Sequence, residues 1–361
     1  MRFYFEEADI WASRKRAVID RINSMGLPLV LFGKSATSNP AFLDKVQVPV
    51  EYVCSNNPKS WGKRHWGFEI VGPEKIQEVY GQYNVLILAA NSEQVITSQL
   101  RQLPVPPAEI FCLDLYWEED GVADYYRSME PVIEDIYDHF GDRESKDAYE
   151  TMIRYRINRD PCLPPRVALS KARQYFPDSL GDREVFLDPD EAFVDAGAYI
   201  GDTVRDFLSA ARGRYRSIYA FEPDAKNFAQ LLESTKGLDN VVCQQLGVGD
   251  RVGQVCFTSG GYASRQSADG EQMVCVDMLD RLLDGVPVTY LKMDIEGSEC
   301  AALRGAKKLI QTNRPKLAIC TYHSAADMVM VPKLILELDP SYKLYFRHYT
   351  YTVSDSICYA I

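Results

Sequence analysis

The sequence predicts an α/β fold with two parallel sheets, a smaller one in the N-terminal half and a larger one in the C-terminal half. Short apolar runs alternate with helix-like segments in both halves. In the C-terminal half, an apolar run at 192–196 leads into a glycine turn and a helix start, as in nucleotide-binding folds. The last two runs, 342–349 and 356–361, are too close for a crossover helix, so they predict an antiparallel hairpin.

The N-terminal part, residues 1–120, is expected to form a small Rossmann-like domain of its own. A helix is predicted at 6–25, with apolar residues on one side and basic residues on the other. Apolar strand-like segments then alternate with helices, an order that indicates a parallel sheet. The strands are predicted at 27–32, 48–54, 84–90 and 109–115, and the later helices at 73–80 and 92–102.

A ligand site in this domain is an open question. The turn after its first strand, with Gly33, Lys34 and Ser35, lacks both G-x-G-x-x-G and a P-loop. The stretch 50–76 resembles the early part of Rossmann-like domains in sugar-modifying proteins. One interpretation is a nucleotide or nucleotide-sugar handle, and the other is a domain that supports packing or a homodimer. The residues that the first interpretation would use after the second strand are Asn56, Asn57, Trp61, Arg64, His65 and Trp66.

Residues 121–180 read as a helical connector. Helices are predicted at 123–140 and 145–157, and Pro161, Pro164 and Pro165 break the pattern. Near its end, Tyr175 and Phe176 are expected to line a substrate entrance.

The remaining residues, 181–361, carry the main site signals. The strand at 192–196 contains Asp195, and the small-residue turn that follows leaves room for a ligand beside free helix N–H groups. The second strand, 217–222, ends in Glu222, which is placed to accept hydrogen bonds from ribose hydroxyls. Further strands are predicted at 240–247, 288–294 and 316–323.

These segments resemble the class I S-adenosylmethionine-dependent methyltransferases, and among them the FkbM-type family. The resemblance covers roughly 181–361, and K-x-D-x-E-G is its most specific string. Many class I enzymes have glycine where Tyr199 stands, a difference that FkbM-type members tolerate. The matching strings are VDAGAYIGDT (194–203), YAFEPD (219–224), LGVGD (246–250), SGGYASRQS (259–267), VDMLDRLL (276–283) and LKMDIEGSE (291–299).

The resemblance implies S-adenosyl-L-methionine as the methyl donor. The turn after the first strand should face its methionine part, Glu222 its ribose, and the end of the third strand its adenine. The residues expected to contact the donor are Asp195, Gly197, Ala198, Tyr199, Gly201, Asp202, Thr203, Glu222, Pro223, Gln245, Leu246, Gly247 and Asp294.

Three residues at the predicted strand ends are candidates for removing the proton of the methyl acceptor. They are Asp294, Glu296 and His323, and the histidine suits a base near neutral pH. The same three could hold Mg²⁺, but no spacing demands a metal, and none is expected. The residues expected to contact the acceptor are Tyr175, Phe176, Ser264, Arg265, Glu296 and His323.

The composition of the chain limits the kinds of binding partner and the cellular location that are expected. A net charge of −11 and a pI near 5.0 argue against a general nucleic-acid binder. The nine cysteines show no C-x-x-C pair, and neither a secretory signal nor a membrane span is evident, so a cytoplasmic location is expected.

The favoured hypothesis is O-methylation of a sugar or other hydroxylated small molecule or glycan, because the resemblance implies a hydroxyl acceptor. Two alternatives stay open: a nicotinamide- or nucleotide-sugar-binding enzyme that uses the N-terminal domain, and a noncatalytic binding protein that keeps the donor fold. The residues themselves do not identify the acceptor.

Overall fold

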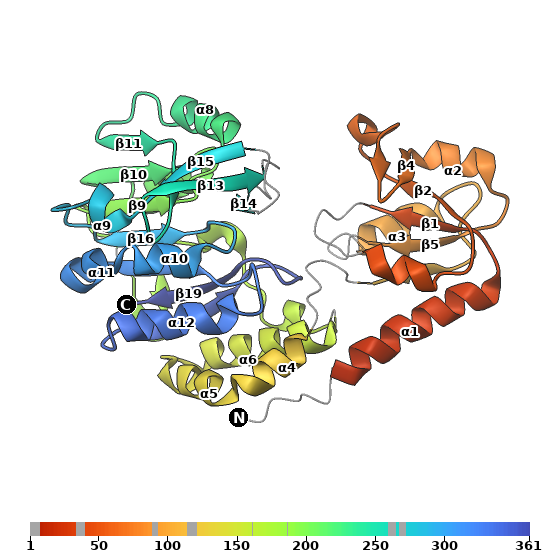
Figure 1. Cartoon of the computed structure of the whole chain (residues 1–361), viewed down its shortest axis with the longest axis horizontal. Helices are drawn as coiled ribbons and strands as arrows, with labels where there is room; N and C mark the ends of the chain where they lie inside the picture. The colour runs from red at the N-terminus through yellow and green to blue at the C-terminus, as the bar shows by residue number, and fades with distance from the viewer. Residues whose placement is uncertain are drawn as a thin grey trace.

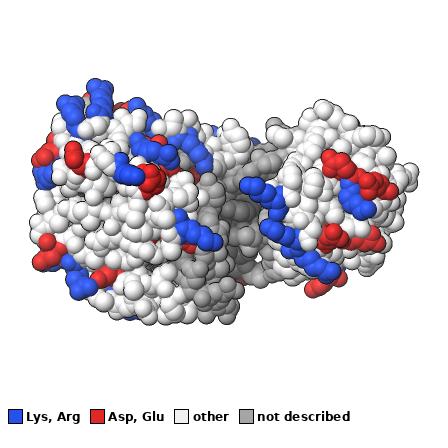
Figure 2. All heavy atoms as spheres, turned by 90° about the horizontal axis from the view of Figure 1, so that it is seen from above, with Lys and Arg blue, Asp and Glu red and all other residues white. Residues whose placement is uncertain are grey.

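The chain forms two lobes, each built around a β-sheet, with three helices between them in sequence (Figure 1). This computed structural model describes residues 8–33, 40–88, 93–113, 121–160, 162–185, 187–258, 265–266 and 272–361. Within these residues, no helix combines the length and the apolar character needed to cross a bilayer. On the face seen in Figure 2, Lys and Arg are interspersed with Asp and Glu on both lobes.

The N-terminal lobe has a six-stranded sheet in the order β3-β4-β2-β1-β5-β6. Its strands pair in parallel except for β3 and β4, so the predicted parallel sheet is confirmed. β1 lies inside the sheet and all four of its residues are buried. The elements are α1 (Ala8–Met25), β1 (Leu29–Phe32), η2 (Pro40–Lys45), β2 (Val50–Cys54), η3 (Pro58–Ser60), β3 (Arg64–His65), β4 (Phe68–Val71), α2 (Pro73–Val79), β5 (Asn84–Ile87), α3 (Glu93–Arg101) and β6 (Ile110–Cys112).

The connector contains α4 (Val122–Ser128), α5 (Glu130–His139) and α6 (Arg143–Asn158). The single helix expected at 123–140 is divided at Met129, because Pro131 occupies the first turn of α5 and cannot continue a preceding helix. Asp142 caps α6 by accepting the Ser145 N–H at 2.7 Å. α6 packs against both α1 and strand β18 (Leu344–His348), so it contacts both lobes.

The C-terminal lobe has a seven-stranded sheet in the order β11-β10-β9-β16-β17-β19-β18. β9 lies inside this sheet between β10 and β16, and the strand order reverses there, which creates the crevice where α/β folds bind ligands. β19 pairs antiparallel with β17 and β18, as predicted for the final hairpin. The elements not yet named are β9 (Ala192–Ala196), α7 (Asp202–Ala210), β10 (Ser217–Phe221), α8 (Ala225–Ser234), β11 (Val241–Gln244), β16 (Tyr290–Met293), α10 (Glu299–Arg304), α11 (Lys307–Asn313), β17 (Lys316–Cys320), α12 (Asp327–Leu338) and β19 (Ser356–Ala360).

A second, small sheet was not predicted. The strand expected at 240–247 ends at Gln244, because the chain turns there and the Leu246 N–H donates to the Gln244 carbonyl at 3.0 Å. The chain then builds the sheet β12-β15-β13-β14, which lies on the side of this lobe that faces the N-terminal lobe (Figure 1). The remaining elements are η5 (Pro164–Arg166), η6 (Lys171–Arg173), β7 (Ser179–Leu180), β8 (Arg183–Glu184), β12 (Gly247–Val248), β13 (Gly253–Thr258), β14 (Arg265–Gln266), β15 (Gln272–Asp277) and α9 (Leu279–Leu282).

Candidate active site

The turn between β9 and α7 requires glycine at two positions. Gly197 has a φ of 80°, and a Cβ there would lie 1.9 Å from the backbone oxygen of Asp294. Gly201 has a φ of 82°, and its Cβ would lie 2.3 Å from the Ser234 hydroxyl oxygen. Because left-handed backbone and close contact both exclude a side chain, the turn can pack tightly against β16 and α8.

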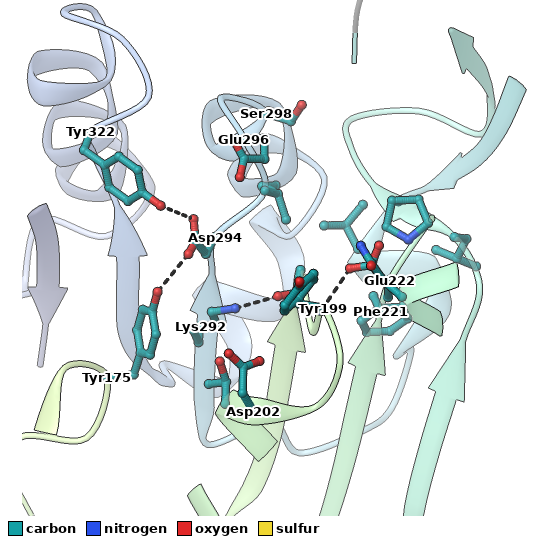
Figure 3. Close-up of a pocket in the computed structure, with 18 of the residues that line it drawn as sticks. Tyr175, Tyr199, Asp202, Phe221, Glu222, Lys292, Asp294, Glu296, Ser298 and Tyr322 are labelled. Carbon is teal, nitrogen blue, oxygen red and sulfur yellow. Dashed lines mark hydrogen bonds between the residues drawn. The ribbon is translucent and has the colours of Figure 1, made fainter. Parts of the chain in front are cut away.

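Glu222 follows β10 and fixes the same turn from the neighbouring strand. Its carboxylate accepts the N–H of Tyr199 at 3.0 Å (Figure 3) and the N–H of Asp224 at 2.8 Å. Glu222 is buried, and burial raises the pKa of its carboxyl to about 7 although the two backbone donors oppose the shift. The acid predicted to hold a ribose therefore lies against the turn predicted to admit the ligand.

Asp195 is paired with Lys292 beneath the turn. The ammonium lies 2.9 Å from the Asp195 Oδ1 and also donates to the Gly197 carbonyl at 2.8 Å. Burial raises the pKa of Asp195 to about 6 although Lys292 opposes the shift. The Asp195 side chain has no exposed surface, so in this structure it supports the turn and is not part of the cavity wall.

Asp294 follows β16 and receives hydrogen bonds from two tyrosines. The Tyr175 hydroxyl donates to Oδ2 at 2.8 Å and the Tyr322 hydroxyl donates to Oδ1 at 3.0 Å (Figure 3). The Nε2 atom of His323 lies 3.3 Å from Oδ1. Burial opposes ionisation of this carboxyl, but His323, Lys292 and Tyr175 outweigh it and lower its pKa below the ordinary value.

His323 lies between carboxylates on both sides of its ring. Nδ1 is 3.1 Å from the Glu299 Oε1, and Nε2 is 3.6 Å from the Glu296 Oε2. Burial alone would lower the pKa of His323, but Glu299 and Asp294 raise it well above the ordinary value. Glu299 is the first residue of α10, and its pairing with the distant His323 could not be predicted from sequence spacing.

A compact set of metal-ligand types is formed by Asp294, Glu299 and His323, whose ligand atoms lie within 4.8 Å of one another. It differs from the predicted set, because Glu299 replaces Glu296. The two carboxylates face opposite ring nitrogens, so an ion bound at Nε2 would lie on the side of the ring away from Glu299. This geometry fits a charged imidazole between two carboxylates better than a chelated ion.

A cavity of about 580 Å³ lies above these groups. Its end near Glu222 is mainly apolar, and its end near Asp294 is rich in hydroxyl, carboxylate and amino groups. The apolar wall consists of Phe221, Pro223, Leu246, Val248, Val255, Val274 and Val276. The polar wall consists of Lys171, Gln174, Tyr175, Asp294, Glu296, Ser298, Tyr322, Ser354 and Asp355.

Most of the predicted contact residues line this cavity. They are Tyr175, Gly197, Tyr199, Asp202, Thr203, Glu222, Pro223, Leu246, Gly247, Asp294 and Glu296. Ala198 and Gly201 are buried within the turn, and Gln245, which follows the end of β11, is exposed and does not line the cavity. Ser264 and the side chain of Arg265 lie outside the described residues.

Two residues expected to contact the acceptor, Phe176 and His323, do not line the cavity. Phe176 is buried against Phe193 and Phe207, with ring centroids 5.5 and 5.6 Å away, so it supports the core beside the site. His323 is 4% exposed and lies behind Asp294, so it reaches the cavity only through other residues. Sequence reasoning missed Tyr322, although its position directly before His323 at a strand end was a usable signal.

In the N-terminal lobe, the described residues of the proposed nucleotide handle make contacts within the lobe. Asn56 pairs with the Gln99 amide at 2.7 Å, and Asn57 caps the helical turn η3. The Trp61 indole N–H donates to the Ser55 carbonyl at 2.7 Å, and Trp66 stacks on His65. Gly33 bonds to the end of β2, the Arg64 guanidinium donates to the Gly67 carbonyl, and Lys34 and Ser35 lie outside the described residues.

The family model of the methyltransferase FkbM domain matches residues 195–352, which include most of the residues that line the cavity. This region is an FkbM-type methyltransferase domain. No curated protein matches the sequence.

The solved structures that resemble this chain differ in how much of it they cover. The methyltransferase FkbM from Methylobacillus flagellatus KT is similar over 99% of this chain and 97% of its own, with a TM-score of 0.70 and 22% identity. Its likeness covers both lobes and shows the fold. Fibrillarin from Aeropyrum pernix, with natively bound S-adenosyl-L-methionine, is 12% identical over 48% of this chain and 67% of its own, with a TM-score of 0.31. An rRNA methylase from Streptococcus thermophilus is 16% identical over 48% and 87%, with a TM-score of 0.32.

Proposed function

We propose that the FkbM domain transfers a methyl group from S-adenosyl-L-methionine to a hydroxyl of a sugar or other hydroxylated acceptor. The observation that carries this proposal is that Glu222 and the Gly197 turn line the same cavity. The strand order reverses beside them, at the position where α/β folds bind nucleotides.

Glu222 keeps hydrogen-bonding capacity for a ribose. Two backbone N–H groups occupy part of its carboxylate, and a carboxylate offers about four lone-pair positions. The apolar wall from Phe221 to Val276 suits the adenine ring, and the turn suits the methionine part. The donor methyl group would then point toward the polar wall.

The polar wall suits a hydroxylated acceptor, because tyrosine, serine and carboxylate groups can exchange hydrogen bonds with hydroxyls. In the reaction, the acceptor oxygen forms a bond to the methyl carbon while the carbon–sulfur bond breaks. The electron pair of the carbon–sulfur bond stays on sulfur, which gives S-adenosylhomocysteine. The hydroxyl proton passes to a base in the polar wall. Holding both reactants in line supplies much of the rate acceleration.

Calorimetry with S-adenosyl-L-methionine tests the donor site. We expect Glu222→Ala to weaken binding at least about tenfold, because charged hydrogen bonds are worth roughly 1.5–3 kcal/mol. Glu233→Ala is the matched control, since Glu233 is an exposed residue of α8 with its side chain 76% accessible. Equal donor affinity in wild type and Glu222→Ala would refute the assignment.

A radiolabelled-methyl screen tests the acceptor class. The wild-type protein is incubated with labelled donor and panels of sugars, glycan fragments, amines and thiols. We expect label on hydroxylated compounds, in a base-stable ether linkage. Label found only on amines or thiols would overturn the hydroxyl assignment while leaving the donor site intact.

A further inference from the structure

A charged network continues behind the cavity wall, where His323 separates the buried Glu299 from two cavity carboxylates. Glu299 has no exposed surface, and its Oε1 accepts the Ile295 N–H at 2.9 Å while lying 3.1 Å from the His323 Nδ1. The backbone of the Asp294–Gly297 turn therefore fixes Glu299, and Glu299 faces one nitrogen of the histidine ring.

The opposite ring nitrogen faces the cavity carboxylates. Nε2 lies 3.3 Å from Asp294 and 3.6 Å from Glu296. A neutral imidazole has one donor and one acceptor nitrogen, whereas a protonated ring has two donors. Because carboxylates flank both nitrogens, only the protonated ring satisfies both sides.

The other charged groups near His323 reinforce this state. Asp327, at the start of α12, interacts electrostatically with His323 and Glu299, and its side chain accepts the Ser324 hydroxyl at 2.8 Å. Arg156 of α6 acts on Asp327 and donates to the Tyr322 carbonyl. Among the described residues, more carboxylates than guanidinium groups surround the ring, and this balance favours its protonated form.

We propose that Glu299 is a positioning residue that holds His323 as an imidazolium, which in turn fixes Asp294 and Glu296 in the cavity wall. The proton of the acceptor then passes to Glu296. This second part rests on the proposed function; the first part concerns the network alone.

The remaining two candidates are less suited to act as the base. A charged imidazolium has no free lone pair with which to accept a proton. Asp294 already accepts two tyrosine hydroxyls and faces His323, and these donors stabilise its ionised form. Glu296 lines the cavity, and its side chain is 23% exposed. On methyl transfer, the Glu296 carboxylate would become a carboxylic acid and release its proton to solvent.

Nitrogen-15 NMR of the histidine rings tests the network without any acceptor. The chain has four histidines, so the spectrum is simple, and His323→Gln assigns the signal. We expect the His323 ring to stay doubly protonated well above pH 6.5, the midpoint of a free side chain. Glu299→Gln should lower its midpoint by at least about one unit, because one flanking charge is lost.

His348 serves as an internal control for folding. Its ring is buried, with Nδ1 2.8 Å from the Ser356 hydroxyl oxygen, and burial lowers its pKa to about 3. Its signals should be unchanged in Glu299→Gln. A wild-type His323 ring that titrates near 6.5, or a folded Glu299→Gln variant with an unshifted midpoint, would overturn the positioning role. If Glu299→Gln does not fold, the wild-type titration alone decides.

The base assignment is tested with the acceptor that the labelling screen identifies. Glu296→Gln should lower kcat by about 10²–10⁴-fold while donor affinity by calorimetry stays within about threefold. A wild-type protein that does not bind S-adenosyl-L-methionine would contradict the proposed function. An active Glu296→Gln variant with wild-type kcat would contradict only the base assignment.

Discussion

At the residue scale, the burial of Glu222 disfavours the charge that its proposed binding role requires. It is buried between β10 and the Gly197 turn, which disfavours its charge, yet holding a ribose requires an ionised carboxylate. Two backbone N–H groups partly compensate for the lost hydration. The result is a pKa raised to about 7, within the range where small changes of pH alter the charge of the site.

This shift predicts pH-dependent donor binding. Below pH 7 the free protein carries a protonated Glu222, and binding through the ionised form must release that proton. Donor affinity should therefore rise as pH increases from 5.5 to 7, by up to about tenfold per unit, and level off above 7. Calorimetry across pH 5.5–8.5 measures it. The slope should be reduced in Glu222→Gln; an identical slope would assign the dependence to another group.

The pH dependence of folding stability that comes from Glu222 should have the opposite sign to the pH dependence of donor affinity. The folded pKa of Glu222 lies above the value of an unfolded chain, so the folded state holds the proton more tightly. Its contribution to the free energy of unfolding is present below about pH 4.5 and is lost as pH rises toward 7. Donor binding and folding therefore favour opposite charge states of one side chain.

Gly197 yields a second residue-level prediction. Gly197→Ala should lower the free energy of unfolding by about 2 kcal/mol or more, because its left-handed backbone and the nearby Asp294 oxygen both oppose a Cβ. Urea denaturation measures the change. Gly249→Ala is the control, since a Cβ at Gly249 meets no atom within 4 Å. Comparable costs in the two variants would contradict the packing argument.

At the element scale, strands were predictable where apolar runs ended in acids or glycines, as at β9, β10 and β16. The small sheet was missed because its strands alternate between apolar and polar residues around a segment rich in serine and glycine. Val255, Val274 and Val276 point into the cavity while Gln254, Met273 and Cys275 are exposed. That alternation is visible in the sequence, but the sheet on which it lies is set by long-range pairing.

The two faces of β15 give a matched pair of variants. Val276→Ser should weaken donor binding about tenfold or less, since it removes roughly 1 kcal/mol of apolar contact from the adenine end. Cys275→Ser, on the exposed face of the same strand, should change affinity less than twofold. Calorimetry of both variants decides. Equal effects would mean that the donor does not contact this wall.

At the scale of the whole molecule, ion pairs join α6 to the edge of the seven-stranded sheet. Arg347 of β18 is buried, and its guanidinium lies 2.7 Å from Asp142 and 3.0 Å from Glu144. The start of α6 and the edge strand β18 are therefore joined by two ion pairs. Sequence reasoning predicted both elements, but it could not pair residues so distant in the chain.

Breaking the ion pair between Arg347 and Asp142 should destabilise the fold. Asp142→Asn should lower the free energy of unfolding by about 3 kcal/mol, because it leaves the buried Arg347 with only the more exposed Glu144 as a carboxylate partner. Glu144→Gln, at a side chain 55% exposed, should cost less than about 1 kcal/mol. Urea denaturation compares them, and equal losses would contradict the burial argument.

The pH dependence of this pair has a defined sign. Burial opposes the charge of Asp142, but Arg347 and Ser145 outweigh it and lower its pKa. Its stabilising contribution is therefore present above the ordinary value of 3.8 and is lost as pH falls below it.

The backbone at Glu296 has a consequence for how the protein could be engineered. Glu296 has a φ of 57°, a conformation that costs a residue with a Cβ about 1–2 kcal/mol and costs glycine almost nothing. A glycine at 296 would therefore relieve strain while deleting the carboxylate that faces the cavity. Selecting variants for thermostability alone would favour that replacement, and the more stable protein would lack the carboxylate that we propose as the base.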